Sequence, residues 1–490
     1  MKRLTTDIES FLCDASNLPG GNVREVLQPD TEEEIAEVLR DCSARKIPVT
    51  VAGAGTGLAG GRIPNGGLVL SLARMNRILG IDPQNMQAVV EPGVILHTLE
   101  KELYEHGLLY PPDPTERGGQ LGGNVATNAS GARTFKYGPT RNWVEGLDVI
   151  LSTGEKLSLP RNRFRAGGHD LLLQTDSGKE LKVKIPRYTM PATSKHAAGY
   201  YARADMDALD LFIGSEGTLG VITRIWLRLT ELPAKLFSGI VFFPGEDQTL
   251  DFVEEIRQRS RSAGESASDI TLEARALEFV DHNALQFIRD QYPSIPADAH
   301  GGAVWFEQEI RSVEDEDALI GQWAEVIERH STLMNDSWFG LTEKDQQKMR
   351  DFRHAVPSAA YEFISAHRMK KFGTDMAVPD DRFREMLRYY RSHINASGLQ
   401  NLTWGHIGNS HLHVNLLPEN EEQAGIAQHI YDSSVTEALK LGGTVSAEHG
   451  IGKLKKKYLQ QMYGADGIEE MRNLRRILDP GGILGVGTMT

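Results

Sequence analysis

A glycine-rich loop at residues 53–61 restricts the nucleotide-binding folds that this chain can adopt. The segment before it, residues 47–51, has the apolar, β-branched composition of a buried strand. The loop contains Gly-x-Gly-x-x-Gly starting at Gly55, the spacing of the dinucleotide fingerprint of the doubly wound fold. That fingerprint opens a helix. Here a proline and two glycines within residues 62–67 disfavour a helix. The sequence therefore predicts a nucleotide-binding fold of a different type.

Two further segments, at residues 111–131 and 213–222, have the same character as the first loop. Each combines glycines with small hydroxyl and amide side chains, so its backbone can approach an extended polar ligand closely. Backbone N–H groups in such loops donate to phosphate oxygens. The three segments together predict a site for a ligand that carries a pyrophosphate.

Two glycine-punctuated segments near the C-terminal end, residues 405–413 and 447–452, contain side chains suited to metal binding and proton transfer. Those side chains are His406, His411, His413, Glu448 and His449. Two imidazoles and one carboxylate hold a divalent ion such as zinc and leave positions open for water or substrate. The sequence therefore predicts a metal site with a base beside it, with ordinary hydrogen-bonded or surface histidines as the alternative.

The spacing of the histidines leaves open which of them bind the metal. His411 and His413 share a face if residues 410–416 form a strand. His406 and His413 converge only if residues 408–410 turn the chain.

The motifs together resemble those of the FAD-linked oxidases of the vanillyl-alcohol-oxidase (PCMH) type, and within them the branch of D-lactate, D-2-hydroxyglutarate and glycolate dehydrogenases. The likeness runs from about Leu27 to Leu484, with the motifs in the family's order. It implies an α+β fold that comprises a two-part FAD-binding domain of the PCMH type, an antiparallel-sheet substrate cap and a helical C-terminal segment. The expected parts are an N-terminal segment 1–24, an FAD-binding domain 25–230 with an insertion at 161–187, a cap 231–418 and a C-terminal segment 419–490.

The resemblance also implies how FAD binds. Residues 53–58 would hold the pyrophosphate, residues 112–131 would flank the isoalloxazine and the phosphates, and residues 216–222 would contact the adenosine half. FAD should be non-covalent, because Thr56 stands at about the place where some relatives carry the histidine that attaches it. The implied cofactor-binding residues are Gly53, Ala54, Gly55, Thr56, Gly57, Leu58, Pro112, Asp113, Thr115, Gly119, Gly122, Gly123, Asn124, Thr127, Asn128, Gly131, Glu216, Gly217, Val221 and Ile222.

By the same resemblance, the metal ligands would be His406, His413 and Glu448. Zinc is the expected ion, with manganese or iron as alternatives. The motif of this branch usually reads His-x-Gly-Asp-Gly-Asn-x-His, and here residues 409–411 replace its Asp-Gly-Asn with Asn-Ser-His. This departure leaves the identity of the metal open and makes His411 a competing ligand.

Residues 349–357 resemble the segment in which this branch places an arginine for the substrate carboxylate, and Arg353 is our choice. A planar guanidinium binds a carboxylate through two hydrogen bonds. Arg350 lies one turn away, and a salt bridge on the helix face is the alternative for either arginine. Lys371 would be the second cation. Asn415 and His449 would line the substrate.

The implied reaction is oxidation of a D-2-hydroxy acid, with D-lactate favoured, to the 2-oxo acid. Pro357 stands where 2-hydroxyglutarate dehydrogenases tend to carry a hydroxyl residue, which disfavours a second substrate carboxylate. The metal would bind the 2-hydroxyl, His449 would take its proton, and the Cα hydrogen would pass as hydride to the flavin. A quinone, a cytochrome or an electron-transferring flavoprotein would reoxidise the flavin.

Two alternatives belong to other functional classes. An alkylglycerone-phosphate synthase uses the same fold without net redox chemistry, but it lacks the ligand segment found here at residues 406–413. The other alternative is a non-catalytic flavoprotein subunit that relays electrons to a partner.

Composition and charge limit the classes of partner and cofactor that we expect for this chain. A formal net charge of −14 disfavours nucleic acid. The two cysteines, Cys13 and Cys42, show no CxxC or clustered spacing, which argues against an iron–sulfur cluster or a disulfide framework. We expect a cytoplasmic protein, since neither a signal peptide nor a transmembrane run is present, and a homodimer by family resemblance. A lysine cluster is typical of a solvated helix face, with a contact for acidic lipid at the membrane surface or for an acidic electron-transfer protein as the alternative: Lys453, Lys455, Lys456 and Lys457.

Local patterns predict four elements that can be compared directly with a structure. Residues 31–34 form a capping box ahead of a helix with apolar spacing over 35–42. Residues 171–183 are typical of a hairpin. Residues 221–227 alternate as a strand, and residues 248–261 are typical of a polar helix.

Overall fold

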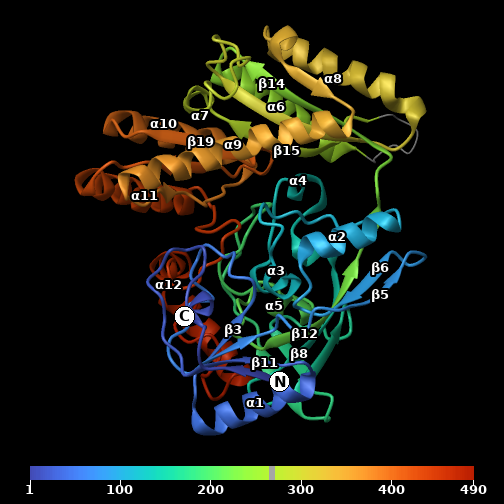
Figure 1. Cartoon of the computed structure of the whole chain (residues 1–490), viewed down its shortest axis with the longest axis vertical. Coiled ribbons are helices and arrows are strands. Elements are labelled where there is room, and N and C mark those ends of the chain that lie inside the picture. The colour runs from blue at the N-terminus through green and yellow to red at the C-terminus, as the bar shows by residue number, and fades with distance from the viewer. Residues whose placement is uncertain (264–270) are drawn as a thin grey trace.

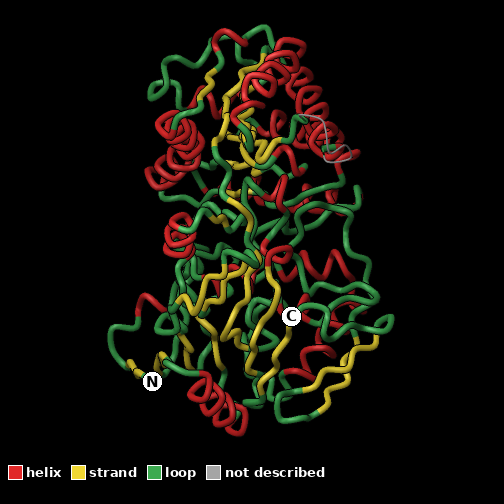
Figure 2. Tube along the Cα trace, turned by 90° about the vertical axis from the view of Figure 1, so that its right-hand side faces the viewer, coloured by secondary structure: helices red, strands yellow, loops and turns green. Residues whose placement is uncertain are grey.

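The computed structural model describes residues 1–263 and 271–490 and has two lobes (Figure 1). The lower lobe in that view contains the chain up to β12 (Val221–Arg228) and also the C-terminal helix α12 (Lys456–Leu478). The upper lobe contains the chain from β14 (Lys235–Phe243) to β20 (His413–Leu416). In the orthogonal view of Figure 2 the lobes remain stacked along the long axis.

The first sheet of the lower lobe has the strand order β1-β2-β4-β3, in which β2, β4 and β3 run parallel and β1 antiparallel. Its strands are β1 (Lys2–Leu4), β2 (Glu25–Gln28), β3 (Val49–Ala52) and β4 (Leu68–Ser71). The glycine loop therefore connects two parallel strands without a helix after the fingerprint, as its proline and glycines predict. Helix α1 (Glu32–Arg45) precedes β3 and buries Ile35 and Leu39.

The start of α1 corrects one detail of the predicted capping box. The Thr31 hydroxyl accepts from the Glu34 N–H at 3.3 Å, as expected for an N-cap. The Glu34 carboxylate, however, accepts from the N–H of Asp30 at 2.7 Å, one residue before the cap. The helix forms where predicted, and its reciprocal bond lies one residue earlier because the chain approaches the helix in an extended conformation.

The second sheet of the lower lobe is antiparallel and has the order β5-β6-β12-β8-β9. The other strands of this sheet are β5 (Ile78–Asp82), β6 (Gln87–Val90), β8 (Val144–Ile150) and β9 (Lys156–Pro160). The predicted hairpin is present as β10 (Asp170–Gln174) and β11 (Glu180–Lys184). A short pair is formed by β7 (Leu108–Leu109) and β13 (Thr230–Glu231). The helices here are α2 (Leu96–Glu105), α3 (Leu121–Thr127), α4 (Thr134–Tyr137) and α5 (Leu209–Phe212).

The upper lobe is built on one antiparallel sheet with the order β17-β14-β16-β15-β19-β20-β18, as the sequence predicts for the cap. Its remaining strands are β15 (Ala274–Val280), β16 (Gly302–Ile310), β17 (Trp338–Gly340), β18 (Phe372–Gly373) and β19 (Asn401–Gly405). Its helices are α6 (Glu246–Ser262), α7 (His282–Phe287), α8 (Glu316–His330), α9 (Glu343–His367), α10 (Phe383–Ser397) and α11 (Glu421–Lys440). The expected α+β fold is confirmed, while the domain boundaries stay predictions.

The C-terminal part of the chain connects the lobes. Helix α11 lies with α10 in the upper lobe, whereas α12 lies in the lower lobe (Figure 1). The segment 441–455 between them therefore crosses from one lobe to the other and carries Glu448 and His449. After α12, the Ile483 carbonyl accepts from the Val49 N–H at 2.8 Å, so the end of the chain attaches beside β3.

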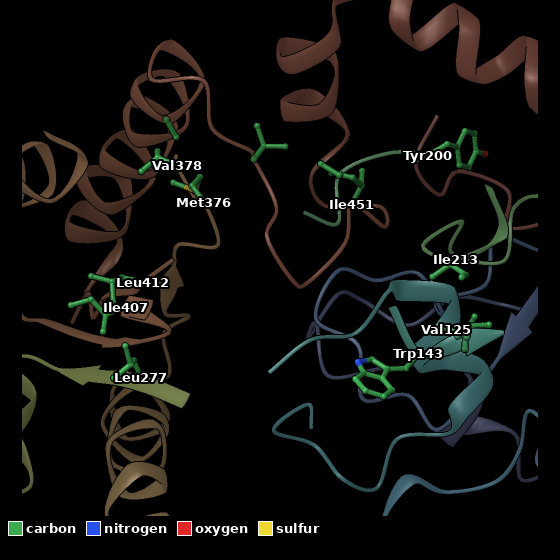
Figure 3. Packing of buried hydrophobic residues seen from close by; sticks show 14 of the residues in the cluster. Val125, Trp143, Tyr200, Ile213, Leu277, Met376, Val378, Ile407, Leu412 and Ile451 are labelled. Carbon is green, nitrogen blue, oxygen red and sulfur yellow. The ribbon is translucent and has the colours of Figure 1, made fainter. Parts of the chain in front are cut away.

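The turn that carries the histidines rests on an apolar base. Ile407 and Leu412 are buried, and Figure 3 shows them beside Leu277 of β15. Met376 and Val378 belong to the same hydrophobic cluster. Because interior side chains are closely packed, this base holds the polar side of the turn in one place. Among the helices of the described residues, none is both long and apolar enough to cross a membrane.

Candidate active site and metal centre

A partly open cavity lies among the predicted nucleotide-binding loops. More than half of the predicted cofactor-binding residues line it: Gly53, Ala54, Gly55, Thr56, Gly57, Gly122, Gly123, Asn124, Thr127, Glu216, Gly217 and Ile222. His449 also lines it, so the cavity extends to the segment that connects the lobes. All three loop segments singled out in the sequence thus meet around one space.

The residues of the cavity fit a cofactor that carries a pyrophosphate. A Cβ atom added at Gly57 or Gly123 would meet no protein atom within 4 Å, so both glycines leave their backbone open to the cavity. Asn124 is 8 % exposed, and its Nδ2 has no hydrogen-bond partner within the described chain. Open glycine backbone and an unpaired amide donor are what phosphate oxygens require.

The other predicted cofactor residues do not line this cavity, and their contact with FAD stays a prediction: Leu58, Pro112, Asp113, Thr115, Gly119, Asn128, Gly131 and Val221. Two of them have structural roles. The Val221 side chain is buried in the core, and the Asn128 amide oxygen accepts from the Arg141 N–H at 2.9 Å. Conversely, Asp14 and Pro92 line the cavity without having been predicted.

Glu216 attaches the lower lobe to the segment that connects the lobes. Its carboxylate accepts from the N–H groups of Ile451 and Gly452, each at 2.7 Å. Burial raises the pKa of Glu216, against these two hydrogen bonds, which lower it. The bonds fix the backbone immediately after His449, so the position of that histidine depends on a residue of the nucleotide-binding half.

The predicted metal ligands converge on one oxygen atom. The Glu448 Oε2 lies 3.0 Å from the His406 Nε2 and 3.5 Å from the His413 Nε2. The His411 Nδ1 lies 4.0 Å from the same oxygen. Ligand atoms of these four residues all lie within 4.8 Å of one another. Three imidazoles and a carboxylate at such separations suit a divalent cation.

A tight turn brings the histidines together and decides between the two predicted arrangements. After β19, residues 407–409 form a short 3-10 helix, and Ser410 adopts a left-handed conformation with φ of 53°. The strand β20 then begins at His413, three residues later than in the strand alternative. Buried Arg257 of α6 holds the turn by donating to the carbonyls of Ile407 (2.8 Å) and Gly408 (3.1 Å).

The outer ring nitrogens of two histidines already have partners. The His406 Nδ1 lies 2.6 Å from the Glu278 Oε1, and the His413 Nδ1 lies 3.0 Å from the Thr374 carbonyl oxygen. The His406 Nε2 donates to the Glu448 Oε2 at 3.0 Å, and a bound metal would take the place of that proton, with the Nδ1 contacts holding Nε2 of each ring as the ligand nitrogen. A carboxylate or carbonyl behind the imidazole is the usual outer-shell arrangement of metal-binding histidines. The protein therefore directs both Nε2 atoms at the predicted metal position.

Lys195 holds the other oxygen of Glu448. Its ammonium is fully buried, donates to the Glu448 Oε1 at 2.5 Å and donates to the Gly131 carbonyl at 2.9 Å. Burial alone would raise the pKa of Glu448, but His406 and Lys195 hold it well below its usual range. Glu448 is thus an ionised carboxylate with one oxygen fixed by Lys195 and the other facing the histidines.

Asp375 organises the loop around His449. This fully buried carboxylate accepts from the backbone N–H groups of Glu448 and His449, each at 3.1 Å. It also lies 3.5 Å from the His449 Nδ1 and 2.5 Å from the Lys455 Nζ. Burial lowers the pKa of His449 to about 4, although Asp375 acts in the opposite direction. His449 is therefore neutral at pH 7 and able to accept a proton.

The two predicted substrate cations lie beside this centre. The Arg353 guanidinium donates to the Glu278 Oε2 at 2.9 Å from Nε and 2.8 Å from Nη2. The Lys371 Nζ donates to the Asn415 Oδ1 at 3.1 Å, and burial lowers the pKa of Lys371 to about 8. Arg350 instead pairs at 2.6 Å with Glu343, which is 86 % exposed, so the helix-face alternative holds for Arg350.

Comparisons with known proteins place this geometry in a family. A family model described as an FAD binding domain matches residues 23–159, and one described as the C-terminal domain of FAD linked oxidases matches residues 238–489, about half of the chain. The chain belongs to the FAD-linked oxidases. It is an FAD-dependent oxidoreductase, and the predicted family is confirmed.

Curated relatives of this FAD-linked oxidase match over nearly its whole length. A D-lactate dehydrogenase of Anaerostipes hadrus is 30% identical over 98% of this chain and 92% of the relative. The glycolate oxidase subunit GlcD of Bacillus subtilis is 29% identical over 95% and 88%. A D-2-hydroxyglutarate dehydrogenase of Xanthomonas citri pv. viticola is 29% identical over 100% and 94%.

A solved structure of an alkyldihydroxyacetonephosphate synthase superposes on this FAD-linked oxidase with a TM-score of 0.63. It covers 96% of this chain and 77% of the synthase, at 16% sequence identity. This likeness concerns the fold, since fold similarity at such low identity does not carry a function.

Several residues of the centre were missed by sequence reasoning. Glu278, Asp375 and Lys195 are isolated in the sequence from the histidine motifs, and no local pattern marks them. Lys455 was assigned to a charged cluster with a solvated face, and this interpretation was wrong for Lys455 itself. It is buried and paired with Asp375, because the segment connecting the lobes folds inward there.

Proposed function

We propose that this FAD-linked oxidase is a D-2-hydroxy acid dehydrogenase that oxidises its substrate, with D-lactate favoured, to the 2-oxo acid. The observation that carries the proposal is His449, which lines the nucleotide cavity and stacks on the imidazole of His413 at 5.3 Å between ring centroids. A flavin in the cavity and a substrate on the histidine centre would thus be neighbours. The names of the relatives support the same class of substrate.

Two cations are positioned to bind the substrate carboxylate. Arg353 bonds to Glu278, which in turn bonds to the predicted ligand His406. Lys371 bonds to Asn415, two residues after the predicted ligand His413. Each cation is therefore linked to the metal centre through a single residue. A carboxylate held by both would place the adjacent 2-hydroxyl near the centre, which is the arrangement that a 2-hydroxy acid requires.

His449 is the base of the proposed reaction. Its Nδ1 faces Asp375, which leaves Nε2 to accept the proton of the 2-hydroxyl. Because the pKa of His449 is lowered to about 4 by burial, the imidazole is in its accepting form throughout the neutral range. Asp375 is a positioning residue, because it holds the backbone and the ring of His449 without facing the substrate.

His406, His413 and Glu448 would hold a divalent metal, with zinc favoured and manganese or iron as alternatives. A metal held by these residues would lower the pKa of the substrate hydroxyl, and FAD would supply the acceptor for the Cα hydrogen and its two electrons. A quinone, a cytochrome or an electron-transferring flavoprotein would then take the electrons. Lys195 and Glu278 contact the ligands on the side away from the metal position. Lys195 fixes the direction of the Glu448 carboxylate, and Glu278 fixes that of the His406 ring.

Anaerobic titration of the purified, metal-analysed protein with D-lactate, L-lactate, glycolate and D-2-hydroxyglutarate tests the proposal through the oxidised flavin absorbance. We expect a D-acid to bleach the flavin and L-lactate to leave it oxidised. Chelation and His449→Ala should each abolish the bleaching. His330→Ala serves as the control, because His330 pairs with Glu255 on the outer helices of the upper lobe.

A bound flavin that none of the acids bleaches would refute the dehydrogenase. It would shift the interpretation to a non-redox synthase or to a subunit that relays electrons. Bleaching by L-lactate as readily as by D-lactate would refute the stereochemical part alone.

A further inference from the structure

His411 is a buried imidazole with one ring nitrogen beside a carboxylate and the other without a partner among the described residues. Its side chain is fully buried, and within the described part of the chain neither ring nitrogen has a hydrogen-bond partner. The Nε2 lies 3.3 Å from the Asp375 Oδ1, and this electrostatic contact compensates the Nε2 in part, so the Nδ1 is the nitrogen that the described residues leave without a partner. Burying an unpaired polar ring is unfavourable, and such groups in native proteins usually have a partner that compensates.

The unpaired Nδ1 of His411 faces the predicted metal position. It lies 4.0 Å from the Glu448 Oε2, the oxygen on which His406 and His413 also converge. The His411 ring centroid is 5.3 Å from that of His406 and 4.6 Å from that of His413. The three rings therefore surround one point.

The spacing of the four ligand atoms agrees with a tetrahedral ion. Metal–ligand bonds of about 2.0–2.1 Å separate neighbouring ligand atoms in a tetrahedron by about 3.4 Å. The Glu448 Oε2 lies 3.0, 3.5 and 4.0 Å from the nitrogens of His406, His413 and His411. These three distances lie on both sides of the tetrahedral value, and all four ligand atoms lie within 4.8 Å of one another, so side-chain movements could bring them onto one ion.

We propose that His411 is a fourth protein ligand, so that the centre consists of three imidazoles and one carboxylate. The inference extends the metal site of the proposed function and concerns its inner coordination shell. It gives a role to His411, which stands where the branch usually has an asparagine. Asp375, beside the Nε2 of His411, would then be the outer-shell carboxylate of this ligand.

A fourth protein ligand changes what the metal can do. A zinc ion with four protein ligands has the closed shell of a structural site, whereas catalytic zinc keeps one position open. Binding of the substrate hydroxyl would therefore require expansion to five or six ligands. Zinc meets that requirement by expanding to five ligands, and manganese(II) or iron(II), the alternatives to zinc, also adopt such coordination numbers.

Metal affinity provides the first test, measured by competition with a chelator for zinc and cobalt(II) on the full-length flavoprotein. We expect His411→Asn, which restores the residue type of the branch, to weaken binding at least ~100-fold, since loss of an outer-shell partner alone costs about 10–100-fold. His330→Asn replaces a histidine remote from the centre and should leave the affinity unchanged. Equal affinity of His411→Asn and the unmodified protein would overturn the proposal.

X-ray absorption of the unmodified zinc protein provides a second test that does not depend on folding of the variant. Three imidazoles in the first shell would support the proposal, and two would overturn it. Cobalt(II) absorption bands that weaken on adding D-lactate would support the expected rise in coordination number. A protein that binds neither ion would refute the metal centre itself. Flavin bleaching, measured separately, would still decide the dehydrogenase activity.

Discussion

Replacing Glu278 by glutamine should weaken metal binding through the outer shell while keeping the shape of the side chain. Glu278 is 3 % exposed and joins the two halves of the centre: one oxygen lies 2.6 Å from the His406 Nδ1, and the other accepts from Arg353 at 2.8 Å. Glutamine occupies nearly the same volume but removes the negative charge. The His406 ring would lose the charged contact that fixes the direction of its Nε2, and Arg353 would lose its ion pair.

The magnitude follows from these contacts. Loss of an outer-shell carboxylate reduces metal affinity by about 10–100-fold, equivalent to about 1.4–2.7 kcal/mol. Breaking the buried pair with Arg353 separately destabilises the fold by about 3–5 kcal/mol, because an uncompensated buried charge remains. Glu278→Gln should therefore bind zinc more weakly and also unfold at a lower temperature.

A matched control separates these two effects. Glu307 is also 3 % exposed, and its carboxylate pairs with buried Arg275 at 2.7 Å on the same sheet, without contacting a predicted metal ligand. Glu307→Gln should lower the unfolding temperature, by less than Glu278→Gln because Glu309 still lies 3.6 Å from Arg275, and should leave the zinc affinity unchanged. Affinity is measured by chelator competition, and stability by thermal unfolding of the metal-free proteins. If both variants lose the same affinity, or neither loses any, the outer-shell role of Glu278 is refuted.

Three further outcomes follow from the cavity and the two cations. Because the pKa of Lys371 is lowered to about 8, its charge is present below that pH and lost above it, so the KM for the hydroxy acid should rise above pH 8. Lys371→Met should raise KM by about 10–100-fold and abolish this pH dependence in steady-state assays. Arg353→Met should raise KM more than Arg350→Met, whose guanidinium pairs at the surface, and equal effects would exclude Arg353 from the carboxylate site. Gly57→Leu should yield folded protein with little bound flavin by visible absorbance, because its side chain would enter the cavity, whereas Gly80→Leu, also in open space, should retain the flavin.

The local elements could be predicted from the sequence because short-range patterns decide them. Helix α1, the hairpin of β10 and β11, the strand β12 and helix α6 all lie within a few residues of their predicted bounds. The proline and glycines after the first loop correctly excluded the doubly wound fold. The three histidines lie within one turn of the chain, so their proximity could be expected from the sequence, whereas Glu448 joins them from a segment 35 residues later.

The sequence by itself thus determined the glycine loops, the elements and the group of ligand-type side chains. Tertiary structure decided which buried charged side chains contact these ligand-type side chains. Phe279 of β15 pairs with Gly405 of β19, and this antiparallel register sets Glu278 opposite His406. Lys195 and Asp375 reach Glu448 and His449 only because the segment between α11 and α12 crosses from one lobe to the other. Such contacts depend on strand register and on the packing of distant segments, which no local periodicity records.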